Sequence, residues 1–387
     1  ERDRCEEVKC SEASEIMPTA TRSSPARSKS PPRASPARSK SPARSKSPAK
    51  NGKSPAKPKS GGGGGANVLQ HLATLASLLL WYLFNGFFNV ANKRLLNGFD
   101  HPWLISWVQL ATGILVVVPA WALGLRRPPR VDGAVLRKFA PIAALHAGGH
   151  ALQVAAMGAG SVYFTTVIKA TEPLIGTLVA LAFTGKIAPW WVNLTFAPIV
   201  GGVAYAAAKP GAATDLSDLL SFAALASIVS TVFFAVAKLL AKRIMTKEMK
   251  SSRNLDAANT YSVLTCCSAA VLLVPSLAAD GAAAWTSFSA AADAGAAAPL
   301  VRELLLCGLY YYAYNECGFR VLDALGAVSQ AVANSAKRVV VLFFAVYFLG
   351  EAASTQKLVG AGVAILGVLM YSLAKMEAEK RAAAKKK

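Results

Sequence analysis

Long apolar segments recur along most of the chain and constrain its fold more than any other feature. Ten of them can be marked, at 73–93, 102–124, 139–158, 161–183, 189–208, 217–241, 257–278, 299–319, 325–349 and 355–375. Each is close to the roughly 20 residues that a helix needs to cross a bilayer. A hydrophobic content of 53% and a mean hydropathy of +0.38 fit the same class. The sequence therefore predicts an all-α polytopic membrane protein with about ten transmembrane helices, in which the Ala-rich stretch 281–298 is a loop.

Three regions follow from this pattern. Residues 1–66 repeat Ser-Pro beside Lys or Arg and end in a glycine run, a composition that predicts a disordered basic tail. Phosphorylation of this tail, or a role as part of a targeting segment, are sharper interpretations. Residues 67–375 form the membrane domain, and residues 376–387 form a basic C-terminal tail.

The net charge of +21 raises the alternative of a nucleic-acid binder. Residues 17–60 alone contain twelve Lys or Arg and no acidic residue, and most of the remaining excess lies in loops. No nucleic-acid partner is therefore expected. The six cysteines lack metal-site spacing and are interpreted as thiols, four of them in apolar segments.

The charges of the loops predict how the chain is oriented. Ten spans place both termini on one side of the membrane, and the loops 126–138 and 242–253 on that side are basic. The opposite loops carry Asp215, Asp218, Asp280, Asp293 and Glu351. Because cations favour the inner side, we expect the termini to face the cytosol or a plastid stroma.

The two halves of the membrane domain resemble each other at an offset of 165–166 residues. Gly185 then aligns with Gly350, Gly201 with Gly367, Tyr205 with Tyr371 and Lys209 with Lys375. The offset equals five segments, an odd number, so the two copies would run in opposite directions. Two inverted five-helix repeats are typical of secondary transporters, whose binding site lies at the repeat interface.

Ionisable residues within the apolar segments indicate a site. Lys337 and Arg338 lie near the middle of one segment and Lys169 lies within another, where a charge is costly unless it faces a cavity or a partner. Adjacent helical residues point about 100° apart, so one ligand can contact both Lys337 and Arg338 only as a multi-oxygen anion in a wide cavity. Arg suits phosphate through its planar donors.

A purely structural network is the alternative interpretation. Glu172 could neutralise Lys169, and Glu316 could neutralise one cation of segment 325–349, which leaves a net charge of +1 among these groups. Pro173 should kink its segment. His146 and His150 are four residues apart, which can suit a metal, but no third ligand lies near them in sequence. No metal, cofactor or catalytic residue is expected, since no enzyme motif occurs.

Several motifs resemble one family. "IKATEP", "AYN", "NSAKRVVV" and "WYLFNGFFNVANKRLLNGF" are similar to signature segments of the plastid phosphate translocators, of the triose-phosphate transporter family within the drug/metabolite transporter superfamily. The resemblance covers about residues 73–375. It implies exchange of inorganic phosphate for phosphorylated C3, C5 or C6 compounds across the inner plastid envelope.

The resemblance also implies roles for individual residues. Lys169, Lys337 and Arg338 would bind the phosphate, and His150 and Tyr314 would complete the site. Gln153 stands where the family often has a small hydroxyl residue, and Glu316 where it often has Gln, so the carbon chain of the substrate stays open. His150 favours the triose, pentose or hexose phosphate members over the phosphoenolpyruvate members.

Three functions are compatible with these features. The first is an antiporter that exchanges phosphate for a sugar phosphate or 3-phosphoglycerate. The second is a nucleotide-sugar transporter of the Golgi or endoplasmic reticulum from the same superfamily, whose members often lack the Lys-Arg pair. The third is a membrane anchor or adaptor whose basic tail binds anionic lipid or nucleic acid. An anchor gives no reason for cations inside apolar segments.

Overall fold

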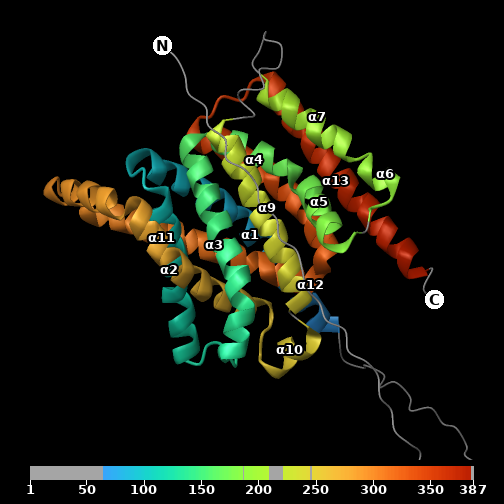
Figure 1. The fold of residues 1–387 in the computed structure, drawn as a ribbon, viewed down its shortest axis with the longest axis horizontal. Helices are drawn as coiled ribbons and strands as arrows, with labels where there is room; N and C mark the ends of the chain where they lie inside the picture. The colour runs from blue at the N-terminus through green and yellow to red at the C-terminus, as the bar shows by residue number, and fades with distance from the viewer. Residues whose placement is uncertain (1–63, 186, 209–220, 245, 385–387) are drawn as a thin grey trace, which may run out of the picture. The chain divides into compact units, whose positions relative to one another are not determined.

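The computed structural model describes residues 64–185, 187–208, 221–244 and 246–384, and all its regular elements are helices. They are α1 (Gly64–Gly98), α2 (Pro102–Ala122), α3 (Gly133–Ala159), α4 (Val162–Ile168), the 3-10 turn η1 (Lys169–Thr171), α5 (Glu172–Thr184), α6 (Trp190–Asn193), α7 (Phe196–Ala207), α9 (Phe222–Ile244), α10 (Lys247–Ser252), α11 (Ala257–Asp293), α12 (Ala297–Leu349) and α13 (Thr355–Ala384). Figure 1 shows their arrangement. The all-α class predicted from the sequence is confirmed.

Seven helical stretches of the described chain are long and apolar enough to cross a membrane. The predicted segments 139–158, 189–208 and 299–319 are not among the seven. The first contains two histidines and a glutamine, and the second is split between α6 and α7, each shorter than a bilayer requires. The structure thus supports a polytopic membrane protein, whereas the count of ten stays a prediction.

The break predicted near Pro173 is present. α4 ends at Ile168, the chain makes the 3-10 turn η1, and α5 begins at Glu172 with Pro173 in its first turn. Proline lacks an amide hydrogen and is best accommodated in the first turn of a helix. Lys169 therefore occupies a turn between two helices.

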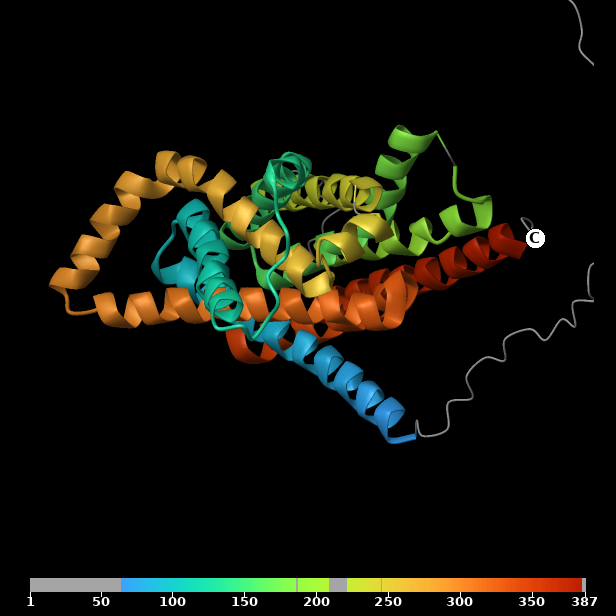
Figure 2. The ribbon, with the colours of Figure 1, turned by 90° about the horizontal axis from the view of Figure 1, so that it is seen from below.

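The predicted loop at 281–298 is wrong. α11 continues to Asp293, and only the turn at Ala294–Ala296 separates it from α12. Alanine has the highest helix propensity, so a run of alanines extends the helix until Gly295, whose φ of +72° suits glycine. Figures 1 and 2 show the end of α11 and the start of α12 projecting together from the other helices.

α12 spans both predicted segments 299–319 and 325–349 without an interruption in its helical assignment. The helix nevertheless doubles back. This is shown by a hydrogen bond of 2.9 Å, in which the Gln330 side chain donates to the Gly318 carbonyl. Twelve residues of straight helix would separate these positions by about 18 Å. The predicted loop between the segments is therefore replaced by a helical reversal, which joins a first arm, residues 297–318, to a second arm, residues 330–349.

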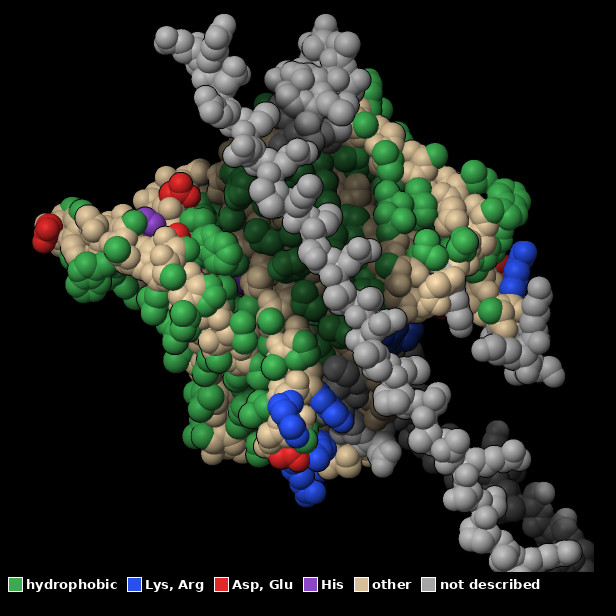
Figure 3. Space-filling view, viewed as in Figure 1, with side chains coloured by type: hydrophobic (Ala, Val, Ile, Leu, Met, Phe, Trp, Pro, Cys, Tyr) green, Lys and Arg blue, Asp and Glu red, His purple; other side chains and the backbone are tan. Residues whose placement is uncertain are grey.

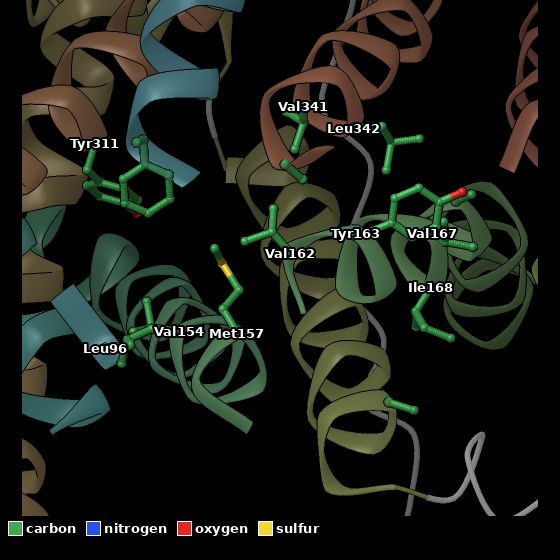
Figure 4. Packing of buried hydrophobic residues seen from close by; sticks show 14 of the residues in the cluster. Leu96, Val154, Met157, Val162, Tyr163, Val167, Ile168, Tyr311, Val341 and Leu342 are labelled. Atoms are coloured by element: carbon green, nitrogen blue, oxygen red, sulfur yellow. The ribbon is translucent and has the colours of Figure 1, made fainter. Parts of the chain in front are cut away.

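α1 packs against both arms of α12, while α3 packs on α9, α7 on α13 and α11 on α2. The largest buried cluster joins α1, α3, α4 and α12, and Figure 4 shows Met157 and Val154 of α3 facing the same interior as Val162 of α4. Close packing of these side chains holds the helices together, since lipid offers no hydrophobic driving force for their association.

α7 and α13 approach so closely that a side chain cannot fit between them. A Cβ atom at Gly202 would lie 2.5 Å from the Ala364 nitrogen, and one at Gly360 would lie 2.6 Å from the Ala206 nitrogen. We expect Gly202→Ala and Gly360→Ala each to lower the free energy of unfolding by about 1–3 kcal/mol through overpacking. Thermal unfolding of the purified protein measures this.

Gly201→Ala and Gly362→Ala are the matched controls, because a Cβ at either position meets nothing within 4 Å. Equal thermal midpoints for all four variants would contradict the close approach of α7 and α13.

One aligned pair of the predicted repeat has the same local structure. Gly185 and Gly350 both end a helix in the left-handed conformation, with φ of 64° and 65°. Tyr205 is exposed whereas Tyr371 is buried, so that pair differs. Lys209 lies outside the described residues. The inverted repeat stays a prediction.

Figure 3 shows a group of cations near α10, with an acidic side chain among them, and an acidic side chain at the tip of the α11–α12 projection. Near the cations, Asp132 begins α3 by accepting from the Val135 amide and pairs with Arg253. These two interactions lower the pKa of the Asp132 carboxyl.

Two of the acidic loop residues, Asp215 and Asp218, lie outside the described residues. α13 extends through most of the predicted C-terminal tail, to Ala384.

Candidate functional site

A cluster of charged side chains lies where α5, α9 and α12 meet, and Glu172 is its centre. Its carboxylate accepts from the Arg338 guanidinium at 3.0 Å and from the Lys238 ammonium at 2.5 Å. Arg338 has 7% of its side chain exposed, against 31% for Glu172 and 69% for Lys238. One carboxylate therefore joins the start of α5 to α9 and to the second arm of α12.

Lys337 points to different partners. Its ammonium lies 4.9 Å from the centre of the Trp81 ring and 5.9 Å from that of Tyr314. Aromatic faces attract cations, but they do not neutralise the charge. Within the described residues Lys337 has no ion pair, so its positive charge is uncompensated by a direct partner.

Lys169 completes the cationic group. Its ammonium lies 5.6 Å from the Phe234 ring of α9. It also interacts electrostatically with Glu172, Lys337, Arg338 and Lys238. These four cations and one carboxylate have a formal charge of +4 − 1 = +3. The cluster therefore carries more positive charge than the +1 predicted from the sequence.

The ion pairs in the structure differ from those of the structural alternative. Glu172 forms its ion pairs with Arg338 and Lys238 rather than with Lys169. Glu316 pairs with Arg126 and Arg320, away from the cations of the second arm of α12. The predicted neutralisation of Lys337 or Arg338 by Glu316 is therefore wrong.

Aromatic rings link the other predicted residues to this cluster. The His150 ring stacks on Tyr311 at 4.1 Å, and Tyr311 lies edge-on to Tyr314 at 5.5 Å. Phe88 of α1 contacts both tyrosines. The Tyr311 ring therefore lies between His150 and Tyr314, and Tyr314 in turn contacts Lys337.

Some buried polar atoms near these residues lack a partner in the described structure. They are Nε2 of His150, Oε1 of Gln153 and Nε of Arg338. Such atoms are costly to leave unpaired. His150 and Gln153 lie one turn apart on α3, so both donor and acceptor capacity is available there for a polar ligand. His146 instead contacts Ser268.

Three residues of this region were not predicted from the sequence: Lys238, Trp81 and Tyr311. Lys238 was inside the predicted segment 217–241, so a cation within an apolar segment was the available signal. Trp81 and Tyr311 had no such signal, because aromatic residues are common in membrane helices. Only the packing of α1 against α12 brings their rings to the cluster.

The turn between α3 and α4 is held from two sides. Lys93 donates to the carbonyls of Met157, Gly158 and Gly160 at the end of α3. Glu351 accepts from the amides of Val162 and Tyr163 at the start of α4, both at 2.8 Å. Opposite charges thus stabilise the two helix ends, and α4 carries Lys169 at its other end.

We expect Glu351→Gln to weaken this anchor, because an amide supplies neither the charge nor the second acceptor. The loss of a helix cap costs about 0.5–2 kcal/mol, and the thermal midpoint should fall accordingly. Glu379→Gln, at an exposed position of α13, is the control. If the two variants unfold at the same temperature, the Glu351 cap does not stabilise α4.

These features define the class: an all-α polytopic membrane protein whose interior holds an excess of cations, as a transporter of anions requires. The model of the Triose-phosphate Transporter family matches residues 72–372. The chain belongs to this family, and it is a transporter rather than an enzyme.

Named relatives agree with the family. The triose phosphate/phosphate translocator of Pisum sativum chloroplasts is 31% identical over 78% of this chain and 73% of its own length. The triose phosphate/phosphate translocator of Spinacia oleracea chloroplasts is 30% identical over 86% of this chain and 81% of its own length. The chloroplastic phosphoenolpyruvate/phosphate translocator 1 of Oryza sativa subsp. japonica is 32% identical over 80% and 73%. Relatives of similar identity thus carry two different substrate names.

Proposed function

We propose that this protein exchanges inorganic phosphate for phosphorylated C3–C6 metabolites across a plastid membrane, with triose phosphate or 3-phosphoglycerate favoured. The observation that carries this proposal is the excess of cations around one carboxylate. Lys169, Lys337 and Arg338 with Glu172 have a formal charge of +2, and the more exposed Lys238 raises it to +3. A phosphate dianion is the ligand class that such an excess recruits. The chloroplastic names of the relatives support the substrate class and the organelle.

In this proposal Lys169, Lys337 and Arg338 bind the phosphate. Their ammonium and guanidinium groups approach from η1 and from the second arm of α12. Tyr314, His150 and Gln153 face the carbon chain, because they lie beyond Lys337 along the row of rings. The unpaired atoms of His150 and Gln153 would there meet substrate hydroxyl or carboxylate groups.

The proposed carrier has ten membrane spans in two inverted five-helix repeats and works by alternating access. It lies in the inner plastid envelope. The shared left-handed caps at Gly185 and Gly350 are consistent with the repeat.

Strict exchange follows from the charge. In the unloaded carrier, like charges repel one another as the cavity closes around them, which penalises the return of an empty site. Any bound dianion removes much of this penalty, whether it is phosphate or a phosphate ester. The protein should therefore carry phosphate slowly unless a counter-substrate waits on the other side.

Uptake of labelled phosphate into liposomes tests the proposal. The purified protein is reconstituted, and parallel liposomes contain phosphate, triose phosphate, 3-phosphoglycerate, phosphoenolpyruvate, glucose 6-phosphate, a nucleotide sugar or no counter-substrate. We expect uptake only against a phosphorylated counter-substrate, and the initial rates rank the substrates. Fast uptake into empty liposomes would contradict strict exchange.

The same assay separates the alternatives. A nucleotide-sugar carrier of the Golgi or endoplasmic reticulum would exchange best against the nucleotide sugar. A membrane anchor would show no exchange, and loss of the charge at Lys169 or Lys337 would leave its function intact.

A further inference from the structure

An apolar groove on the outside of the helices lies far along α12 from the charged cluster. It has a volume of about 770 Å³ and runs between α2 and the first arm of α12. The lining side chains are aliphatic except for Thr112 and Arg302. Thr112 donates its hydroxyl to the Val108 carbonyl. Arg302 is therefore the one lining side chain with charge to offer a ligand.

The groove has a floor and an open mouth. At its deep end the two helices touch, since a Cβ at Gly308 would lie 2.4 Å from the Thr112 hydroxyl oxygen. Towards Ala297 the first arm of α12 leaves α2 and joins the projection with α11 (Figure 2). The volume falls within the range of roughly 300–1,000 Å³ typical of ligand sites, although this groove opens sideways.

The chemistry changes along the groove in one direction. Arg302 lies in the second turn of α12, close to the turn at Ala294–Ala296. Leu305 and Leu309 follow at about 1.5 Å per residue, with Leu115 opposite them on α2. One end thus offers a cation near a helix terminus and the other offers only hydrocarbon, a polarity that matches a lipid with an anionic head group.

Arg302 is available to such a head group. It is exposed and has no ion pair among the described residues. The adjacent Glu303 does not line the groove, because consecutive helical residues point about 100° apart. Long cationic side chains near helix ends reach to the membrane interface, where lipid phosphates lie.

We propose that the groove between α2 and the first arm of α12 binds one anionic phospholipid, with its phosphate on Arg302 and an acyl chain along Leu305, Leu309 and Leu115. The proposal depends on the chain being a membrane protein and not on which substrate it carries. It needs no contact with Lys169, Lys337 or Arg338.

Native mass spectrometry of the purified protein tests this. The protein is equilibrated with phosphatidylglycerol or with phosphatidylcholine, and the retained lipid is counted without any transport substrate. We expect one phosphatidylglycerol to be retained in preference to phosphatidylcholine. Arg302→Gln should weaken this retention about fivefold, the effect of one cation near a lipid head group. The matched control Glu303→Gln should leave it unchanged or slightly raise it.

A second pair of variants tests the groove itself. Ala298→Trp fills the open end and should lower retention of both lipids, whereas Ala292→Trp, on an exposed face of α11, should not. Equal retention of the two lipids by all variants would overturn the proposal, and so would a dimer that replaces the lipid. Phosphate exchange in liposomes is a separate readout, so either proposal can fail alone.

Discussion

Lys337→Gln is expected to reduce phosphate exchange by about 10- to 100-fold while leaving the thermal midpoint nearly unchanged. The ammonium has no ion pair in the described structure and faces the rings of Trp81 and Tyr314. Its removal leaves no carboxylate without a partner, so folding loses little. A charge-assisted hydrogen bond to an anionic ligand contributes about 1.5–3 kcal/mol, which corresponds to the stated loss. Initial rates in liposomes measure it.

Lys375→Gln is the matched control. Lys375 also lies over a tyrosine ring, with 5.6 Å between its ammonium and the centre of Tyr371, but it is exposed and belongs to α13. Exchange should be normal in this variant. If Lys337→Gln transports at the normal rate, or if both variants fail equally, Lys337 does not bind the substrate.

Glu172→Gln is expected to destabilise the empty protein and to make it respond more strongly to phosphate. The change raises the formal charge of the cluster from +3 to +4 and removes the partner of the buried Arg338. Breaking a fully buried pair costs about 3–5 kcal/mol. Because Glu172 is partly exposed to solvent, which screens its charge, we expect about 1–3 kcal/mol.

The thermal midpoint with and without phosphate measures both effects. Phosphate should raise the midpoint of Glu172→Gln more than that of the unchanged protein, because the anion replaces the missing carboxylate. Glu377→Gln removes an exposed carboxylate that pairs with Arg381 near the C-terminal end of α13, and it should change neither value. A variant that is as stable as the unchanged protein and no more responsive to phosphate would show that Glu172 does not balance these cations.

Much of the fold was predictable because membrane helices must be long, apolar and internally hydrogen-bonded. Pro173 predicted the break before α5. The cations within apolar segments indicated a cluster of charged side chains. The predictions were wrong where a helix propensity was overlooked, or where packing between helices, rather than the local sequence, decides the structure. The alanines of 281–298 have a strong helix propensity, which the prediction of a loop between two apolar segments did not take into account. The reversal of α12 has no Gly-Pro signal at residues 320–324 and is fixed by contacts of Gly318.

Which of the charged residues pair with one another could not be predicted from the sequence. Lys169 and Glu172 are neighbours in sequence, so their pairing was the economical interpretation. In the structure Arg338 and Lys238 approach Glu172 from other helices. Sequence separation says nothing about such partners, which depend on how α5, α9 and α12 pack. Glu316 was assigned to the wrong cations for the same reason.

In the proposed carrier, the position of Glu172 would also set a threshold for the charge of a ligand. A carboxylate fixed within the cluster is an intramolecular competitor for Arg338, present at an effective concentration of about millimolar or more, as for groups joined by short links. A singly charged anion offers Arg338 no more than Glu172 already provides. A doubly charged phosphate ester can displace the carboxylate and still interact with Lys337. The resident carboxylate would thus exclude chloride and small monocarboxylates while admitting dianions.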